Sequence, residues 1–179
     1  QIGIEEYLKS ETTLIDVRSP GEYRKGHIPG AINIPLFSDT ERARVGTVYK
    51  RQSKEKAMCL GYKYVQPKLE EFILHSKEAA PKGRVTVYCA RGGLRSSSFA
   101  EYLEENGFFH VSVIAGGYKA YRKHALGTFD IPFHLRILGG YTGSGKTPVI
   151  HQLMKRGYQV IDLEGLAMHR GSAFGAIDE

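Results

Sequence analysis

Residues 84–96 read Arg84-Val-Thr-Val-Tyr-Cys89-Ala-Arg-Gly-Gly-Leu-Arg95-Ser96. The first six positions are rich in β-branched and aromatic residues, which predicts a buried strand that ends at Cys89. From about Arg95 to Asn106, apolar side chains recur at helical spacing, and Gly107 suits the end of that helix. This stretch therefore predicts a strand, a glycine-containing loop and a helix in direct succession.

Similar elements surround this stretch. Short β-rich runs at residues 12–18, 31–35 and 110–115 predict three further strands. Short helices are predicted at 20–25 and 118–123. Strands that alternate with helices indicate an α/β fold, in which a parallel sheet carries helices on both faces.

Residues 39–65 interrupt this alternation with a long, helix-prone and mostly basic segment. Its basic residues outnumber its acidic ones, and they are Arg42, Arg44, Lys50, Arg51, Lys54, Lys56 and Lys63. The whole chain of 179 residues carries a net charge of +6, which favours an anionic partner such as nucleic acid or phosphate. The alternative is a basic protein whose charged helix pair is simply solvated.

The composition argues against a membrane-spanning protein and against a secreted, disulfide-stabilised one. Hydrophobic residues make up 41%, enough for a core, and no apolar run approaches the roughly 18 residues that span a bilayer. No signal peptide pattern opens the chain. Two cysteines, Cys59 and Cys89, argue against a disulfide framework and fit a reducing cytoplasm. Because the chain starts at Gln1 and stops abruptly at Glu179, we expect a piece of a longer protein.

The loop after Cys89 has the composition of an anion-binding site. Its two glycines let the backbone curl so that several N–H groups point inward, and such a nest at a helix N-terminus binds anions and lowers a thiol pKa. Arginine can grip an oxyanion with two parallel hydrogen bonds. We therefore predict Cys89 as a catalytic nucleophile. The predicted oxyanion-binding residues are Ala90, Arg91, Gly92, Gly93, Leu94 and Arg95. The alternative is a buried structural cysteine.

A second anion-binding loop reads Gly140-Tyr-Thr-Gly-Ser-Gly-Lys146-Thr147 and matches the Walker A pattern. A strand at 135–139 is predicted before it, a helix at 146–156 after it, and a strand at 158–162 beyond. The predicted phosphate-binding residues are Gly140, Gly143, Ser144, Gly145, Lys146 and Thr147, with Thr147 at Mg²⁺ if that ion binds. The pattern does not distinguish a nucleotide from another diphosphate ester, and a plain glycine-rich turn is the alternative.

The domain organisation follows from these elements. We place a linker at 125–134, because it contains Gly127 and Pro132 and shows no clear period. Residues 135–179 then hold only the first β-loop-α-β unit of a P-loop domain, since a complete one needs more residues than remain.

Several segments of residues 1–124 resemble the rhodanese superfamily, whose members carry sulfur or selenium on a loop cysteine. The matching segments are Leu14-Ile-Asp-Val-Arg18, Glu22-Tyr23, residues 26–35 from Gly26 to Pro35, and Gly116-Gly-Tyr118. The spacing departs from that of single-domain sulfurtransferases, because Arg95 lies six residues after Cys89. That wider loop also occurs in rhodanese-related cysteine phosphatases, which stay an alternative, although Tyr88 stands where they typically have His.

Residues outside the two loops receive weaker assignments. Asp16 and Arg18 are expected to make structural polar contacts at a strand end, His27 is ambiguous, and Cys59 is expected to pack in the interior. A plain sulfurtransferase with a nucleotide-binding appendage, and a non-catalytic tRNA-binding module, also remain alternatives.

The combination of the two loops resembles the bacterial tRNA 2-selenouridine synthases. Further segments carry this resemblance: Val45-Gly-Thr-Val-Tyr-Lys50, Gly116-Gly-Tyr-Lys-Ala120 and residues 162–175, which include His169 and Arg170, both without an assigned role. The resemblance implies replacement of sulfur by selenium in 2-thiouridine at the tRNA wobble position. It implies selenophosphate and geranyl diphosphate as substrates, no tightly bound cofactor and no metal in the cysteine loop.

The same resemblance implies the partners and the location. We expect tRNA to contact the basic segment through Arg42, Arg44, Lys50 and Arg51, because backbone phosphates supply most of the affinity in such complexes. The diphosphate of geranyl diphosphate is expected at the Walker loop, although a nucleotide such as ATP, with or without Mg²⁺, is an alternative. An enzyme that supplies selenophosphate is a further expected partner, with no membrane contact and a cytoplasmic location.

Overall fold

The computed structural model describes residues 1–167. The chain divides between Ile131 and Pro132 into two compact units, which are described separately below.

The first unit is built on a four-stranded parallel sheet. Its strands are β1 (Thr13–Asp16), β2 (Ile32–Asn33), β3 (Arg84–Tyr88) and β4 (His110–Val113), in the spatial order β2-β1-β3-β4. The central strands are in register with Ile15 opposite Val87. All four strands fall within the runs predicted from the sequence, and the predicted parallel α/β fold is confirmed.

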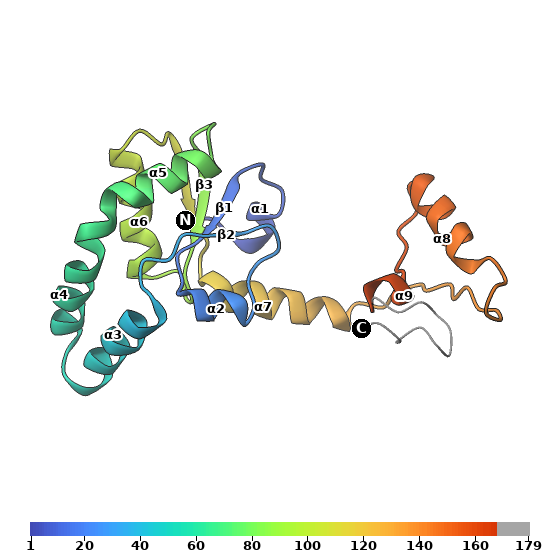
Figure 1. Cartoon of the computed structure of the whole chain (residues 1–179), viewed down its shortest axis with the longest axis horizontal. Coiled ribbons are helices and arrows are strands. Elements are labelled where there is room, and N and C mark those ends of the chain that lie inside the picture. The colour runs from blue at the N-terminus through green and yellow to red at the C-terminus, as the bar shows by residue number, and fades with distance from the viewer. Residues whose placement is uncertain (168–179) are drawn as a thin grey trace. The chain divides into compact units, whose positions relative to one another are not determined.

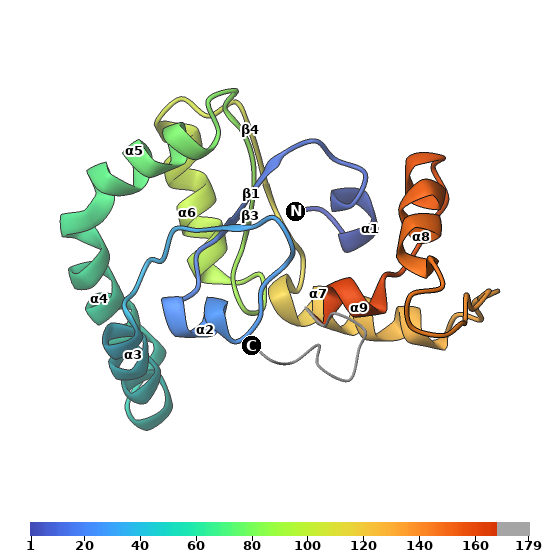
Figure 2. The same ribbon diagram turned by 45° about the vertical axis from the view of Figure 1, so that its right-hand side comes forward.

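Each face of the sheet carries an apolar core, because successive side chains on a strand point to opposite faces. Ile15 belongs to one core, with Phe72 of α5 (Leu69–Ala79) and Phe99 of α6 (Leu94–Glu105). Leu14 belongs to the other, with contributions from α1 (Ile4–Tyr7) and α7 (Gly117–Gly127). Figures 1 and 2 show these two helix pairs on opposite sides of the sheet. The prediction of helices on both faces is therefore confirmed.

The basic segment folds as two helices, α3 (Asp39–Arg51) and α4 (Lys54–Val65), which lie side by side (Figures 1 and 2). Ser38 caps α3 with Glu41 in a reciprocal capping box, and Ser53 caps α4. Val45 and Val65 pack partly buried against the core formed by α5 and α6. A short 3₁₀ helix, Gln66–Lys68, connects α4 to α5.

Short α2 (Pro20–Arg24) joins β1 to the strand next to it and also contacts α3. Ser19 and Glu22 form its capping box, with Pro20 in the first turn, where its missing N–H is harmless. The amide nitrogen of Gly21 donates to Asp39 over 2.8 Å, and Arg24 pairs with the same carboxylate at 3.3 Å. Helix α2 is thus the element on which the N-terminal end of α3 rests.

Helix α7 is longer than the predicted 118–123. It runs to Gly127, and a 3₁₀ turn follows at Thr128–Asp130, so the first part of the segment expected as a linker is helical. Gly127 adopts ordinary helical angles, with φ −66°, so this glycine is part of the helix and does not break it. The placement of a linker at 125–134 stays a prediction.

The second unit contains the predicted helix, α8 (Lys146–Lys155), and a short α9 (Leu163–Leu166). The two strands expected at 135–139 and 158–162 are not formed. A strand needs a neighbouring strand for its N–H and C=O groups, and residues 132–167 provide none. Their apolar side chains are correspondingly exposed, with Ile137 94% and Ile161 64% accessible.

Candidate active site

Cys89 lies at the carboxyl edge of the sheet, the edge at which open α/β proteins bind ligands. Tyr88, the last residue of β3, is aligned with Asp16, the last residue of β1. The chain then turns through the loop, and α6 starts at Leu94 with Gly93 as its N-cap residue. The predicted succession of strand, loop and helix is present, and it places the thiol beside the N-terminus of α6.

The thiol of Cys89 is buried and hydrogen-bonded. Only 3% of the residue is exposed, and its Sγ lies 3.2 Å from Oγ of the fully buried Ser96. Burial raises the pKa of Cys89. The hydrogen bond with Ser96, the backbone of Arg91, the charge of Arg95 and the backbone of Gly93 lower that pKa by more, so it lies below its ordinary value. The thiolate is the nucleophilic form, so this environment favours reactivity.

Two glycines, Gly92 in the loop and Gly117 after β4, let the loop lie directly against another segment of backbone. A Cβ on Gly117, which has φ +57°, would overlap the carbonyl oxygen of Cys89, and one on Gly92 would lie 2.5 Å from the carbonyl oxygen of Ile114. The first turn of α7 also holds the loop, because Tyr118 and Lys119 donate backbone N–H groups to the carbonyl oxygens of Cys89 and Ala90 at 2.9 and 3.1 Å. The Gly116-Gly117 motif was predicted only by resemblance. In the structure Gly117 lets two backbones meet, whereas a Cβ on Gly116 would lie 2.8 Å from the Cβ of Ala120.

The two arginines of the loop are placed differently. Arg91 is exposed. Arg95 forms an ion pair with Glu22 of α2 at 3.2 Å, and Arg42 of α3 reaches the same carboxylate oxygen at 3.3 Å. Partial burial raises the pKa of Glu22. The charges of Arg95 and Arg42, together with hydrogen bonds from Ser19 and Arg95, outweigh burial, and the pKa lies below its ordinary value. Nothing in the sequence pattern pointed to Glu22 as a partner of the loop, because the two are separated by 73 residues.

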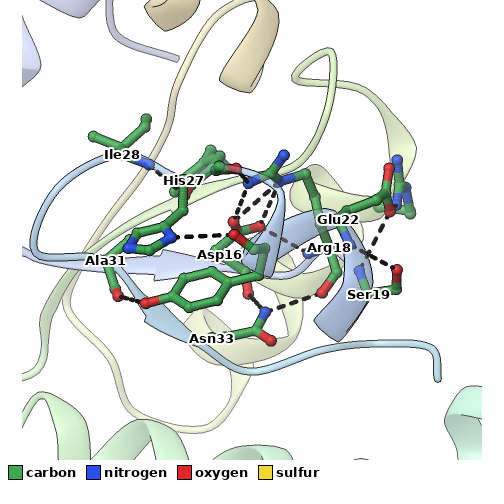
Figure 3. A network of polar contacts seen from close by, with 12 residues as sticks. Asp16, Arg18, Ser19, Glu22, His27, Ile28, Ala31 and Asn33 are labelled. Carbon is green, nitrogen blue, oxygen red and sulfur yellow. Dashed lines mark hydrogen bonds and ion pairs between the residues drawn. The ribbon is translucent and has the colours of Figure 1, made fainter. Parts of the chain in front are cut away.

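Asp16 and Arg18 form a buried ion pair near the loop (Figure 3). Their exposed fractions are 0% and 3%, and the shortest N–O distance is 2.6 Å. Arg18 also donates to the carbonyl oxygen of Gly26, and its guanidinium lies 4.1 Å from the ring centre of Tyr118. Asn33 donates to the carbonyl oxygens of both residues of the pair. The contacts of Arg18 with Gly26 and Tyr118, and those of Asn33 with the pair, join separate segments of the chain. They agree with the structural role expected from the sequence.

Three other residues singled out in the sequence have definite places. Tyr88 is fully buried, its hydroxyl accepts the N–H of Ile28 at 3.1 Å, and burial and then Asp16 raise its pKa. The ring of His27 stacks on that of Tyr23, with 3.8 Å between the ring centres. Cys59 is exposed, so the expectation that it packs in the interior was wrong. It lies on the outer side of α4, a side that helical spacing alone did not identify.

The exposed cations of the basic segment are Arg44, Lys50, Arg51, Lys54, Lys56 and Lys63. Arg42 differs, because it is engaged by Glu22 and only 37% of its side chain is exposed. Of the four predicted tRNA contacts, three are therefore freely accessible in this unit.

The second unit holds the Walker loop at the start of α8. Gly143 and Gly145 both adopt φ +81°, the left-handed region that glycine favours. Nζ of Lys146 donates to the carbonyl oxygens of Gly140 and Tyr141, each over 2.9 Å, so the lysine folds across the loop. Thr147 is exposed in the first turn of α8. His169 and Arg170 lie outside the described residues.

Within residues 1–167, no cluster of three or more His, Cys, Asp or Glu side chains is arranged to hold a metal ion. No helix in that same range has the length and apolar character needed to cross a membrane.

Comparison with known proteins finds a family match for each of the two parts of the sequence. The model of the rhodanese-like domain matches residues 4–124, and the model of the tRNA 2-selenouridine synthase AAA domain matches residues 133–179. A tRNA 2-selenouridine synthase from Salmonella enteritidis is 45% identical over 174 residues, covering 94% of this chain and 46% of that protein. One from Nitrosomonas europaea is 42% identical, covering 94% and 44%.

A solved structure adds the three-dimensional comparison. The N-terminal domain of a Clostridium difficile 630 protein is 43% identical with a TM-score of 0.65, over 70% of this chain and 98% of that one. The chain spans about half the length of the curated relatives it matches. The chain therefore belongs to the rhodanese-like domain family, and its sequence relatives are tRNA 2-selenouridine synthases.

Proposed function

We propose that this chain contributes the selenium-transfer site of an enzyme that converts 2-thiouridine at the tRNA wobble position into 2-selenouridine. The observation that carries the proposal is the Cys89 thiol, whose pKa is lowered within a wide oxyanion-type loop. The chain's relatives that share both of its segments are named tRNA 2-selenouridine synthase. The substrates would be selenophosphate, geranyl diphosphate and tRNA, and the reaction would take place in the cytoplasm.

The geometry of the loop suits the phosphoryl group of selenophosphate. Three oxygens on a tetrahedral phosphorus need several donors, and the N–H groups at the N-terminus of α6, with Arg91 and Arg95, would supply them. Cys89 Sγ attacks phosphorus, the P–Se bond breaks, and selenium keeps the electron pair. Water then cleaves the S–P bond and releases phosphate, so that no oxidant or reductant is needed.

The selenium set free in this way replaces sulfur on the nucleoside. The sulfur must first become a leaving group, and geranyl diphosphate provides this. The thiouridine sulfur forms a C–S bond with the geranyl group, diphosphate leaves, and the base loses a proton. Selenium then bonds to C2, the C2–S bond breaks, and geranylthiol departs with a proton. Neither the release of selenium from phosphorus nor the replacement of sulfur at C2 changes the oxidation state of sulfur, selenium or phosphorus.

The Walker loop is the proposed site for the diphosphate of geranyl diphosphate. Its left-handed glycines and Lys146, which already contacts backbone carbonyl oxygens of the loop, form a cradle for two linked phosphates. ATP is the competing ligand. Titration of the full-length protein with each compound separates them, since the proposal requires tighter binding of geranyl diphosphate than of ATP in the absence of tRNA.

The selenium-transfer step is tested with the full-length protein, selenophosphate and tRNA that already carries S-geranyl-2-thiouridine. The wild-type protein should form 2-selenouridine, geranylthiol and phosphate in equal amounts, and Cys89→Ser should form none of them. Cys59→Ser is the matched control, because Cys59 is exposed and outside the loop. Hydrolysis of a phosphotyrosine mimic, or sulfur transfer from thiosulfate, without selenouridine formation would instead support a phosphatase or a sulfurtransferase.

A further inference from the structure

Glu22 is the residue through which the basic segment reaches the cysteine loop. Its Oε2 oxygen lies 3.2 Å from Arg95 of the loop and 3.3 Å from Arg42 of α3. The same carboxylate accepts the N–H of Ser19 in the capping box at 3.3 Å. Glu22 is fixed at its backbone by α2 and shared at its tip by two guanidinium groups from different elements.

This arrangement has a consequence for anion binding. An oxyanion beside Cys89 and the carboxylate of Glu22 both require the positive charge of Arg95. While Glu22 holds Arg95, that charge is partly neutralised. Glu22 does not need to become an unpaired charge when it releases Arg95, because Arg42 lies at nearly the same distance. A pocket also opens beside Glu22, lined in part by Lys25 and Arg122, so the carboxylate has room to move.

We infer that Glu22 is a positioning residue that restrains Arg95 before an oxyanion binds and transfers to Arg42 when the oxyanion takes its place. The inference rests on the proposed function, because it concerns oxyanion binding at the same loop. It adds a role for the basic segment: α3 sets the affinity of the cysteine loop through one side chain. A tRNA that engaged Arg42 would return Glu22 to Arg95 and weaken binding of the donor.

The test is a titration of the 179-residue chain with inorganic phosphate, followed by amide shifts of residues 90–95 in ¹H–¹⁵N spectra. Glu22→Gln removes the competing charge and should tighten phosphate binding about fivefold. Arg42→Gln removes the alternative partner and should weaken it by a similar factor. Glu78→Gln and Lys82→Gln are the matched controls, since both residues are exposed and precede β3, whereas the loop follows it.

The decisive variant combines Glu22→Gln with Arg42→Gln. If Arg42 acts only by accepting Glu22, its replacement should change the dissociation constant by less than about twofold once Glu22 is gone. A long-range charge effect would instead leave the weakening unchanged, and that result would overturn the inference. Weaker phosphate binding by Glu22→Gln alone would overturn it too, because Glu22 would then orient Arg95 toward the anion.

The absence of any loop shift in all variants would also refute this coupling. It would leave the proposed function open, since selenouridine formation is measured separately with Cys89→Ser. The converse result is that the wild-type protein forms no 2-selenouridine while the phosphate titrations of the variants still give the expected dissociation constants. That result would refute the proposed function and leave the coupling between Glu22, Arg95 and Arg42 intact.

Discussion

The backbone N–H of Tyr118 donates to the carbonyl oxygen of Cys89 over 2.9 Å. This bond ties the N-terminus of α7 to Cys89, the first residue of the cysteine loop. It forms only because Gly117, directly before Tyr118, has no side chain where the two backbones meet. The shape of the loop after β3 is therefore set partly by a segment that follows β4.

Gly117→Ala should deform the loop and destabilise the fold. The added Cβ would overlap the carbonyl oxygen of Cys89, and φ +57° strains any L-residue with a side chain by about 1–2 kcal/mol. We expect a loss of at least about 2 kcal/mol in the free energy of unfolding, measured with urea, and slower alkylation of Cys89. Gly127→Ala in the same helix should be neutral, because its Cβ meets nothing. Equal effects of the two variants would contradict this role of Gly117.

Ser96→Ala should raise the pKa of Cys89. The wild-type pKa lies below the ordinary value, so the thiolate persists to lower pH, and the iodoacetamide rate should fall only as pH drops below that lowered pKa. Without the Ser96 hydroxyl, 3.2 Å from Sγ, the midpoint of the pH–rate curve should move to higher pH. Ser97→Ala is the control, because the hydrogen bonds of that hydroxyl within the described part of the chain go to the backbone carbonyl oxygens of Gly93 and Leu94. An unmoved midpoint in Ser96→Ala would refute the assignment.

Arg18→Met should be strongly destabilising because it leaves Asp16 buried without its partner. Removal of one member of a buried ion pair costs about 3–5 kcal/mol, whereas exposed pairs contribute about 0–1 kcal/mol. Arg24→Met, which removes an exposed pair with Asp39, should therefore have little effect. Both are measured by chemical denaturation. A small loss in Arg18→Met would mean that solvent or other groups satisfy Asp16.

Charge reversal of Arg44 and Lys50 should weaken tRNA binding by the full-length protein. Both side chains are exposed on α3, and each lost phosphate contact should also reduce the dependence of affinity on salt. The control is reversal of Lys77, an exposed lysine on α5. If filter binding at low salt gives the same affinity for all three proteins, the basic segment is only a solvated helix pair.

Lys146→Met should abolish binding of geranyl diphosphate to the full-length protein without unfolding it. Among residues 1–167, the hydrogen bonds of Lys146 Nζ go to two backbone carbonyl oxygens of the loop, so its loss removes a charge that would face the ligand and little packing. Lys155→Met, at the other end of α8, is the control. Calorimetric titration measures the affinity. Retained binding by Lys146→Met would place the diphosphate elsewhere.

The sequence predicted the parts of the site that depend on local pattern. The run of β3, the glycines after Cys89 and the spacing of α6 are encoded within residues 84–106, and the structure forms them there. The helix pair at 39–65 was likewise visible in its helix propensity. These elements are determined by neighbours in the chain, so a reading of the chain finds them.

Contacts between distant segments could not be predicted in the same way. Nothing local shows that Glu22 reaches Arg95, or that Gly117 lies against Cys89, because both depend on how α2 and α7 pack at the edge of the sheet. The strands expected at 135–139 and 158–162 show that a local pattern can also predict an element that does not form. Their sequences suit strands, but a strand forms only with a partner.

The central claim is that Cys89 is required to place selenium on tRNA, and nucleoside composition tests it most directly. Cells that lack the full-length protein are supplied with the wild-type, Cys89→Ser or Cys59→Ser form, and their tRNA nucleosides are analysed by mass spectrometry. We expect 2-selenouridine with the wild type and Cys59→Ser, but with Cys89→Ser only the 2-thiouridine form and its S-geranyl derivative. Wild-type amounts of 2-selenouridine with Cys89→Ser would contradict it.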